Sequence, residues 1–298
     1  MIKYEWRTSL SPGESAELSD LLGRAAEYDA EPGYNRIDFA DVDRSMAQSD
    51  SSVRHLLIWM LPYATALGEP DQPDRIAGLL RLRCSPDGSA HANVVVDPGL
   101  RSIGIMTLLL ERVGLNTASP GGWLGTGAHT VTAWAQGNHP AAGRLSNRFL
   151  IPRTRRVWKL IRSADAVEDA TAAPVLELID DAALADLGWV SAPPGSDHTY
   201  ALREAGRIVG VTALDLRAVA SEEFGRCATI VSAVASPAAD ALQRRRLLDG
   251  AAALAHEAGM TGVIIHIDSD DTDLVNACRL AGFQHDRTDV RYQIGGQP

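Results

Sequence analysis

The chain has 298 residues, of which 45% are hydrophobic and 22% charged, and its formal net charge is −10. This length predicts two domains, while the acidic total and the aromatic content of 5% argue against a nucleic-acid partner. The polar N-terminus and the short apolar runs predict no signal peptide and no membrane partner, and three widely spaced cysteines favour a reducing cytoplasm over disulfides or a zinc site.

The charge is unevenly distributed along the chain. Residues 1–162 hold 18 Lys and Arg against 17 Asp and Glu, whereas residues 163–298 hold 10 against 21. An anionic ligand is therefore expected to bind more favourably to the first half than to the acidic second half.

The first half alternates strands and helices in a β-α-α-β-β-β-α-β-α-β order. Ser11, Pro12 and Glu14 form a helix start, and Ser85 to Gly88 form a hairpin turn. Strands are expected at 3–9, 56–61, 75–83, 89–96, 130–135 and 156–161, and helices at 41–48, 101–114 and 138–149. A further helix should start at Ser11, run through Ala25 and stop near Pro32-Gly33.

The second half repeats this order in shortened form, which indicates a duplicated domain. We expect strands at 175–179, 200–203, 208–216, 227–235, 263–267 and 290–294, and helices at 181–187, 239–258 and 271–281. The predicted domains are 1–162 and 174–298, joined by a linker at 163–173. The fold class is mixed α+β, with a mixed sheet flanked by helices in each unit.

The stretch 94–110 is the most informative part of the chain. Val94–Val96 is a short buried strand, Pro98-Gly99 a tight bend, and Arg101 to Gly104 the entrance to an amphipathic helix. The free N–H groups at such a helix start form a ready site for phosphate. The alternative is an ordinary strand–turn–helix crossover with no ligand.

Two tandem units with a strand–Pro–helix crossover resemble the GNAT N-acetyltransferase superfamily, whose acetyl-CoA motif is V-x-P-x-x-[RQ]-x-x-G-x-[GA]. Val96 to Gly104 matches this motif, and Met106 replaces its last small residue. Asn138-His139-Pro140-Ala141 and the segment 271–283 are similar to the later N-x-x-A…GF segment of that superfamily.

The resemblance implies that coenzyme A, as acetyl-CoA, binds in the first half. The Val94 and Val96 backbone would contact pantetheine, and Gly104 and the Thr107 hydroxyl would favour phosphate binding. The expected cofactor-binding residues are Val94, Val95, Val96, Arg101, Ser102, Ile103, Gly104, Ile105, Met106, Thr107, Asn138 and Arg144. No metal site is expected, because the His and Asp residues lack ligand spacing.

The corresponding stretch of the second half departs from the acetyl-CoA motif. Asp240 stands where the motif has Arg, and Gln243 and Arg245 stand where it has small residues. A carboxylate aimed at a phosphate is repulsive, so we expect no ordinary coenzyme A site there.

Acetyl transfer needs a general base, and three residues are candidates. His91 and Asp97 flank the central strand, and His139 precedes the late helix. Each residue has a structural alternative. His91 is then a surface strand residue, Asp97 a turn-forming residue and His139 a helix-entry residue. The superfamily's thiolate-protonating tyrosine near the late helix is missing from both halves, and Cys278 in the second half is better explained as a buried apolar residue.

The predicted function is acetyl-CoA-dependent N-acetylation of a small-molecule amine. Among tandem members the chain is most similar to the mycothiol synthase family, which implies a cysteinyl glycoside as acceptor. In that family the C-terminal unit is implied to carry out the transfer. The alternative is a catalytically inactive acyl-CoA-binding or partner protein. We expect a monomer or a homodimer.

Overall fold

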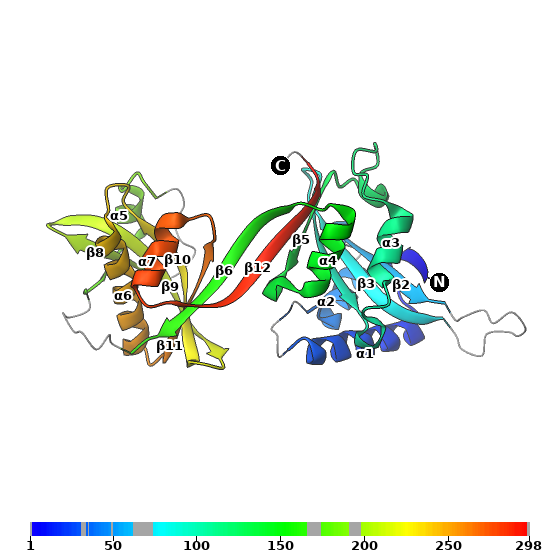
Figure 1. The fold of residues 1–298 in the computed structure, drawn as a ribbon, viewed down its shortest axis with the longest axis horizontal. Helices are drawn as coiled ribbons and strands as arrows, with labels where there is room; N and C mark the ends of the chain where they lie inside the picture. The colour runs from blue at the N-terminus through cyan, green and yellow to red at the C-terminus, as the bar shows by residue number, and fades with distance from the viewer. Residues whose placement is uncertain are drawn as a thin grey trace, which may run out of the picture. The chain divides into compact units, whose positions relative to one another are not determined.

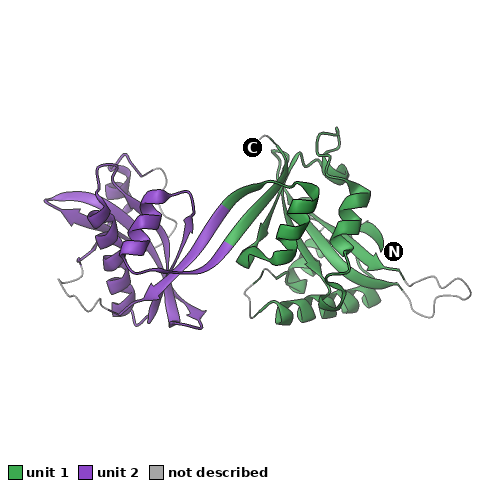
Figure 2. Cartoon of the chain, viewed as in Figure 1, with its two compact units in different colours: residues 1–155, 289–298 green, residues 156–288 purple. Residues whose placement is uncertain are grey.

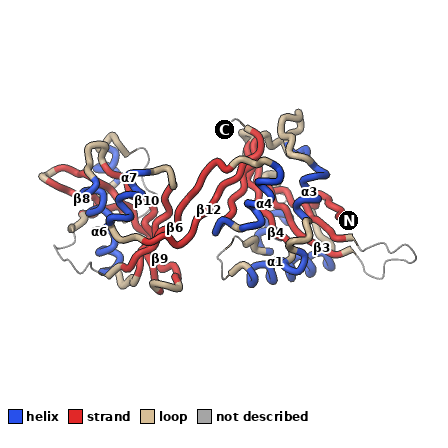
Figure 3. Tube along the Cα trace, viewed as in Figure 1, coloured by secondary structure: helices blue, strands red, loops and turns tan. Residues whose placement is uncertain are grey.

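The computed structural model describes residues 2–30, 34, 36–48, 50–61, 74–165, 174–190 and 198–296. It contains two compact units (Figure 2): residues 1–155 with 289–298, and residues 156–288. Each unit has a mixed β-sheet flanked by helices (Figures 1 and 3), so the predicted fold class is confirmed.

The unit boundaries differ from the predicted domain limits. The first boundary lies at Arg155, and the last residues return to the first unit because the end of the C-terminal strand pairs with strand β5. Most of the predicted linker lies outside the described residues. The sequence also predicts turns at 68–74 and 193–195, and all of these residues except Asp74 lie outside the described ranges.

In unit 1 the sheet order is β1-β2-β3-β4-β5-β12, and β4–β5 is its parallel pair. Its elements are β1 Ile2–Arg7, α1 Pro12–Tyr28, α2 Phe39–Ala47, β2 Val53–Met60, β3 Arg75–Cys84, β4 Ser89–Val96, α3 Ile105–Val113, β5 Thr130–Ala135, α4 Pro140–Phe149 and the start of β6 Arg153–Ser163. Short 3₁₀ turns occupy Pro98–Leu100, Trp123–Gly125 and Gln136–Asn138.

Two apolar clusters cover the two faces of this sheet. On one face Leu57, Leu79 and Val95 pack against α1 and α2. On the other face Leu80 and Ala92 pack with α3 and its neighbours. This division follows from the strand period of two, which sends successive side chains to opposite faces.

Helix α1 begins as its sequence predicts. The Ser11 hydroxyl accepts the Glu14 N–H, the Glu14 carboxylate accepts the Ser11 N–H, and Pro12 occupies the first turn. This capping box satisfies two otherwise unpaired donors and fixes the helix start.

Unit 2 has the order β6-β11-β10-β9-β8-β7, with β10–β11 as its parallel pair. Its remaining elements are β7 Glu177–Leu178, α5 Asp181–Ala185, β8 Thr199–Glu204, β9 Arg207–Ser221, β10 Gly225–Ala235, α6 Ala241–Glu257, β11 Gly262–Asp268, α7 Thr272–Leu280 and the start of β12 Gln284–Gly295. One continuous core joins its sheet to α6 and α7. None of the helices in the described ranges is long and apolar enough to span a bilayer.

His55 on β2 is a buried histidine whose titration changes the free energy of unfolding. Its Nε2 lies 2.8 Å from the Ser45 hydroxyl of α2, and burial with the nearby Arg81 charge lowers the pKa of His55 to about 4. The unfolded chain, with a histidine pKa near 6.5, binds this proton first as the pH falls. His55 therefore destabilises the fold progressively from about pH 6.5 to pH 4, by about 3 kcal/mol in total.

We expect His55→Gln to remove this pH dependence, because glutamine can donate to Ser45 but does not titrate. In chemical denaturation between pH 7 and pH 4, the unfolding free energy of the wild type should fall by about 3 kcal/mol more than that of the variant. Parallel curves would contradict the assignment.

Candidate functional site

The central strand β4 separates from its parallel neighbour halfway along its length. Its ladder with β5 runs only from Ser89 to Ala92, while its ladder with β3 continues to Val96. The backbone of residues 93–96 is therefore paired on one side and open on the other. Val94 is 41% exposed at this opening. We call the gap between β4 and β5 beyond Ala92 the splay.

The backbone groups of Val94 and Val96 face the splay. The Asp97 N–H donates to the Ala77 carbonyl of β3, and successive N–H groups of a strand alternate in direction. The Val95 N–H therefore points to β3, and those of Val94 and Val96 point away from it. Val95 also buries its side chain in the core, so this geometry does not support the contact predicted for it.

Helix α3 begins without a side-chain cap. Gly104 occupies the N-cap position with φ of +89°, a left-handed conformation that favours glycine, and the described residues provide no side-chain cap for the first turn. The N–H groups of Ile105, Met106 and Thr107 precede the first helical bond, which Leu108 donates to Gly104. They are directed out of the helix at the positive end of its dipole.

The helix starts four residues later than predicted because the chain first makes a 3₁₀ turn and a left-handed Ser102, with φ of +69°. Ser102 and Ile103 are exposed beside the first turn. Met106 packs against the core on the α3 face, which directs its bulk away from solvent.

Arg101 makes a set of internal contacts. Its guanidinium forms a bidentate ion pair with Asp29 at 2.6 and 2.8 Å, and its Nε donates to the Val96 carbonyl at 3.1 Å. It also lies 5.0 Å from the centre of the Tyr28 ring. Arg101 thus joins the end of α1 to the β4–α3 turn, and the phosphate contact predicted for its side chain would require exchange of Asp29.

Asp97 is buried and fully engaged. Its Oδ2 accepts from Arg24 at 2.7 Å and Arg75 at 2.8 Å, and its Oδ1 accepts the Gly99 N–H at 2.8 Å. Burial raises the pKa of Asp97, but these three hydrogen bonds outweigh it and leave the pKa below its ordinary value. The structure therefore favours a positioning role for Asp97 over the base role predicted from the sequence.

His139 caps α4 at the start of the helix that follows β5. Its Nδ1 accepts the Ala141 N–H at 3.1 Å, which leaves the proton of the neutral ring on Nε2. Burial and then the Arg101 charge lower the pKa of His139, so the ring is neutral near pH 7. His139 accordingly presents a donor rather than a lone pair, contrary to the predicted base role. Arg144 on α4 lowers the same pKa.

A tyrosine from another part of the chain lies beside the start of α4. The Tyr34 ring centre lies 4.3 Å from that of His139, and the Tyr34 N–H bonds to the Asp29 carbonyl. Asn138 precedes His139 with φ of +49°. The sequence gives no local signal for Tyr34 or Asp29, because both approach α4 and the β4–α3 turn from a distant segment.

His91 lies on β4 two residues before the splay opens. Burial lowers the pKa of His91 and the Arg83 charge lowers it further, against a hydrogen bond with Asn93 that raises it. Its imidazole is thus neutral near pH 7. Of the three predicted catalytic residues, His91 alone has neither an ion pair nor a helix cap among its described contacts.

Unit 2 contains the same splay but a different helix start. The β10–β11 ladder ends at Ile230, while β10 runs on to Ala235. At the N-terminus of α6, however, the Asp240 carboxylate accepts the Gln243 N–H, and the Gln243 side chain accepts the Asp240 N–H. This capping box occupies the Gln243 N–H, the counterpart of the Thr107 N–H that α3 leaves open, and places a negative charge at the helix start.

No group of three or more His, Cys, Asp or Glu is placed to hold a metal ion within the described ranges.

Comparison with known proteins agrees with this architecture. No protein-family model matches the chain. A mycothiol acetyltransferase of Saccharomonospora viridis is 24% identical over 99% of this chain and 100% of its own length. A mycothiol acetyltransferase of Sanguibacter keddieii is 27% identical over 73% of this chain and 78% of its own.

Two solved structures match nearly the whole chain. A GCN5-related N-acetyltransferase from Sphaerobacter thermophilus has a TM-score of 0.57 at 14% identity and covers 99% of this chain and 96% of its own. A tandem GNAT protein from the clavulanic acid biosynthesis pathway has a TM-score of 0.55 at 15% identity, with 100% and 99% covered. The chain therefore has the fold of tandem GNAT proteins and is distantly similar in sequence to mycothiol acetyltransferases.

Proposed function

We propose that this protein transfers an acetyl group from acetyl-CoA to the amine of a small molecule, with the coenzyme A site in unit 1. The observation that carries this assignment is the contrast between the two crossover helices. Helix α3 begins at a glycine and leaves the N–H groups of its first turn open, whereas α6 begins at a carboxylate that accepts the Gln243 N–H of its first turn. Phosphate is favoured at the first and repelled at the second.

The residues around the splay fit the rest of such a ligand. The outward N–H groups of Val94 and Val96 would pair with the amide groups of a pantetheine arm, as a neighbouring strand would. The N–H groups of Ile105, Met106 and Thr107 would hold the pyrophosphate. Acetyl-CoA would supply the acetyl group as a thioester, and the carbonyl carbon of this thioester is the electrophile.

We assign the chemistry to three side chains. His91 takes the proton that the amine loses as its nitrogen bonds to the carbonyl carbon. His139 donates a hydrogen bond from Nε2 to the negative charge that develops. Tyr34 returns a proton to the sulfur as the C–S bond breaks. The lowered pKa of His91 suits it to a base that must be neutral near pH 7.

The first test is calorimetric titration of the wild-type protein with coenzyme A. We expect one site per chain, and replacing Asp240 by alanine should add no second site, because Gln243 and Arg245 still crowd α6. No coenzyme A binding at all would refute the proposal.

The second test is acetyl transfer from acetyl-CoA to a panel of amines, including a cysteinyl glycoside because of the named relatives. Turnover of that glycoside would extend the relatives' activity to this chain. Coenzyme A binding without turnover of any amine would favour the alternative, an inactive acyl-CoA-binding protein.

A further inference from the structure

A row of polar and basic side chains lies on the α1–α2 face of the unit 1 sheet. His55 on β2, Arg81 on β3 and Asn93 on β4 are directly opposite one another in the strand registers. Arg83 and His91 form the next opposite pair on the same face, two residues further along β3 and β4. Opposite residues share a face, with Cβ atoms about 4.5–5.5 Å apart. We call these five residues the basic row.

Arg81 is the unusual member of the row. Its side chain is half-buried, and its Nε is buried without a hydrogen-bond partner in the part of the chain that the structure describes. Burial lowers the pKa of Arg81, and the Arg83 charge lowers it further. The buried and unpaired Nε of a charged side chain costs stability.

The nearest acidic residues do not neutralise Arg81. Asp41 and Asp50 influence it only as more distant charges, and neither lies within ion-pair distance among the described residues. The Asp41 carboxylate is paired with Arg44 at 2.9 Å, and that of Asp50 accepts from Ser52 at 2.6 Å. Arg83 adds a second positive charge that also lacks an ion pair within the described ranges.

His55 contributes an acceptor but no charge. The Ser45 hydroxyl donates to the carbonyls of Asp41 and Val42, both at 2.9 Å, so it must accept the proton of His55 Nε2. The remaining nitrogen, Nδ1, is buried and has no partner among the described residues. The basic row therefore has two cations without an ion pair among the described residues, the half-buried Arg81 and the exposed Arg83, and no anion.

The row ends where the splay begins. Asn93 is the first residue of β4 beyond its ladder with β5, and the next residue, Val94, turns its N–H to the splay. Neighbouring strands lie about 4.8 Å apart, so Arg81 is one strand away from the position at which an amine would be acetylated.

We propose that Arg81 and Arg83 bind a carboxylate of the acceptor, so that the amine substrate also carries a carboxylate, as amino acids and short peptides do. This assignment rests on the proposed acetyl transfer and names its substrate class. The planar guanidinium forms paired hydrogen bonds with a carboxylate, and the ligand would supply the counter-ion that Arg81 lacks.

The test is Arg81→Met, assayed with glycine, β-alanine and 4-aminobutanoate and with the carboxamide of each. We expect KM for the amino acids to rise about 10- to 100-fold, the effect of one charged hydrogen bond, with KM for the carboxamides unchanged. The melting temperature should rise, since methionine removes an unpaired buried charge.

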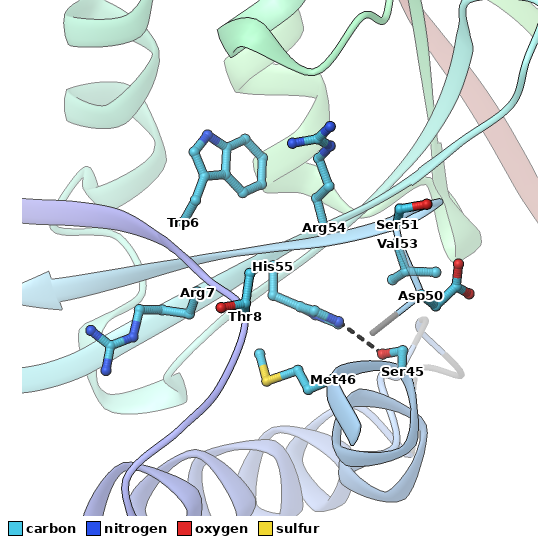
Figure 4. A pocket seen from close by; sticks show the side chains of 10 residues that line it. All are labelled: Trp6, Arg7, Thr8, Ser45, Met46, Asp50, Ser51, Val53, Arg54 and His55. Atoms are coloured by element: carbon cyan, nitrogen blue, oxygen red, sulfur yellow. Dashed lines mark hydrogen bonds between the residues drawn. The ribbon is translucent and has the colours of Figure 1, made fainter. Parts of the chain in front are cut away.

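The matched control is Arg54→Met, which makes the same change one residue from His55. Figure 4 shows Arg54 and His55 on opposite faces of β2, around a pocket of about 310 Å³ that both line. We expect Arg54→Met to leave KM for the amino acids unchanged.

The outcomes separate this inference from the proposed function. Binding of the amino acids is also titrated in the presence of coenzyme A, where no transfer occurs. If wild type acetylates other amines but neither binds nor acetylates the amino acids, the substrate class is wrong and the acetyltransferase stands. An equal loss for carboxamides, a lower melting temperature, or preference for 2-aminoethyl phosphate would each overturn the carboxylate assignment.

Discussion

Replacing Gly104 by glutamate should abolish coenzyme A binding in calorimetric titration. The new carboxylate would stand at the first turn of α3, where the N–H groups of Ile105, Met106 and Thr107 are open. It would compete for those donors and repel a phosphate. We expect at least about a 100-fold loss of affinity, since two or more charged hydrogen bonds of about 1.5–3 kcal/mol each are lost.

Two control variants separate this charge effect from backbone strain. Gly104→Ala carries the cost of a positive φ, about 1–2 kcal/mol of stability, without the charge. Its added Cβ would meet only the Thr107 Cβ at 4.0 Å, so coenzyme A should still bind. Gly13→Glu adds the same charge at an exposed position of α1 and should change nothing. Equal affinity losses in Gly104→Ala and Gly104→Glu would show that strain alone disrupts the site.

Much of this site follows from local sequence. The Pro98-Gly99 bend, the positive φ of Gly104 and the capping box of α1 all depend on residues within a few positions of one another. The sequence comparison of the two crossovers is also local, because Asp240 and Gln243 cap α6 three residues apart. Short-range chemistry of this kind can be predicted without the fold.

The contacts that decide side-chain roles are long-range. Arg101 is paired with Asp29, 72 positions earlier, and Asp97 with Arg24, 73 positions earlier. Both pairs depend on how α1 packs against the β4–α3 turn, which no local pattern specifies. Local sequence therefore could not reveal that the side chains of Arg101 and Asp97 are already occupied by these partners.

Long-range packing also supplies what the local sequence lacks. The absence of a tyrosine on α4 suggested lost chemistry, whereas the fold brings Tyr34 to His139. Arg81 has no distinguishing signal in the strand pattern, since an arginine in an alternating strand is usually solvated. Only its burial without a counter-ion sets it apart.

Replacing His91 by alanine should lower kcat by about 100- to 10,000-fold, the usual contribution of a general base. Burial and the Arg83 charge hold the pKa of His91 below its ordinary value. The wild-type rate should therefore fall only below about pH 6.5, where the imidazole becomes protonated and can no longer accept the amine's proton. This acidic limb of the pH–rate profile should be lost in the variant.

A base and a merely structural histidine predict different responses to added imidazole. Imidazole can fill the space left by the ring and accept the proton, so it should restore part of the activity of His91→Ala. His129→Ala removes another histidine of unit 1, which bonds to the Thr117 carbonyl, and any rate it loses should not return with imidazole. Coenzyme A affinity should be unchanged in His91→Ala, because the ring lies two residues before the splay opens. A variant that keeps wild-type kcat would exclude His91 as the base and leave the coenzyme A site in unit 1 unaffected.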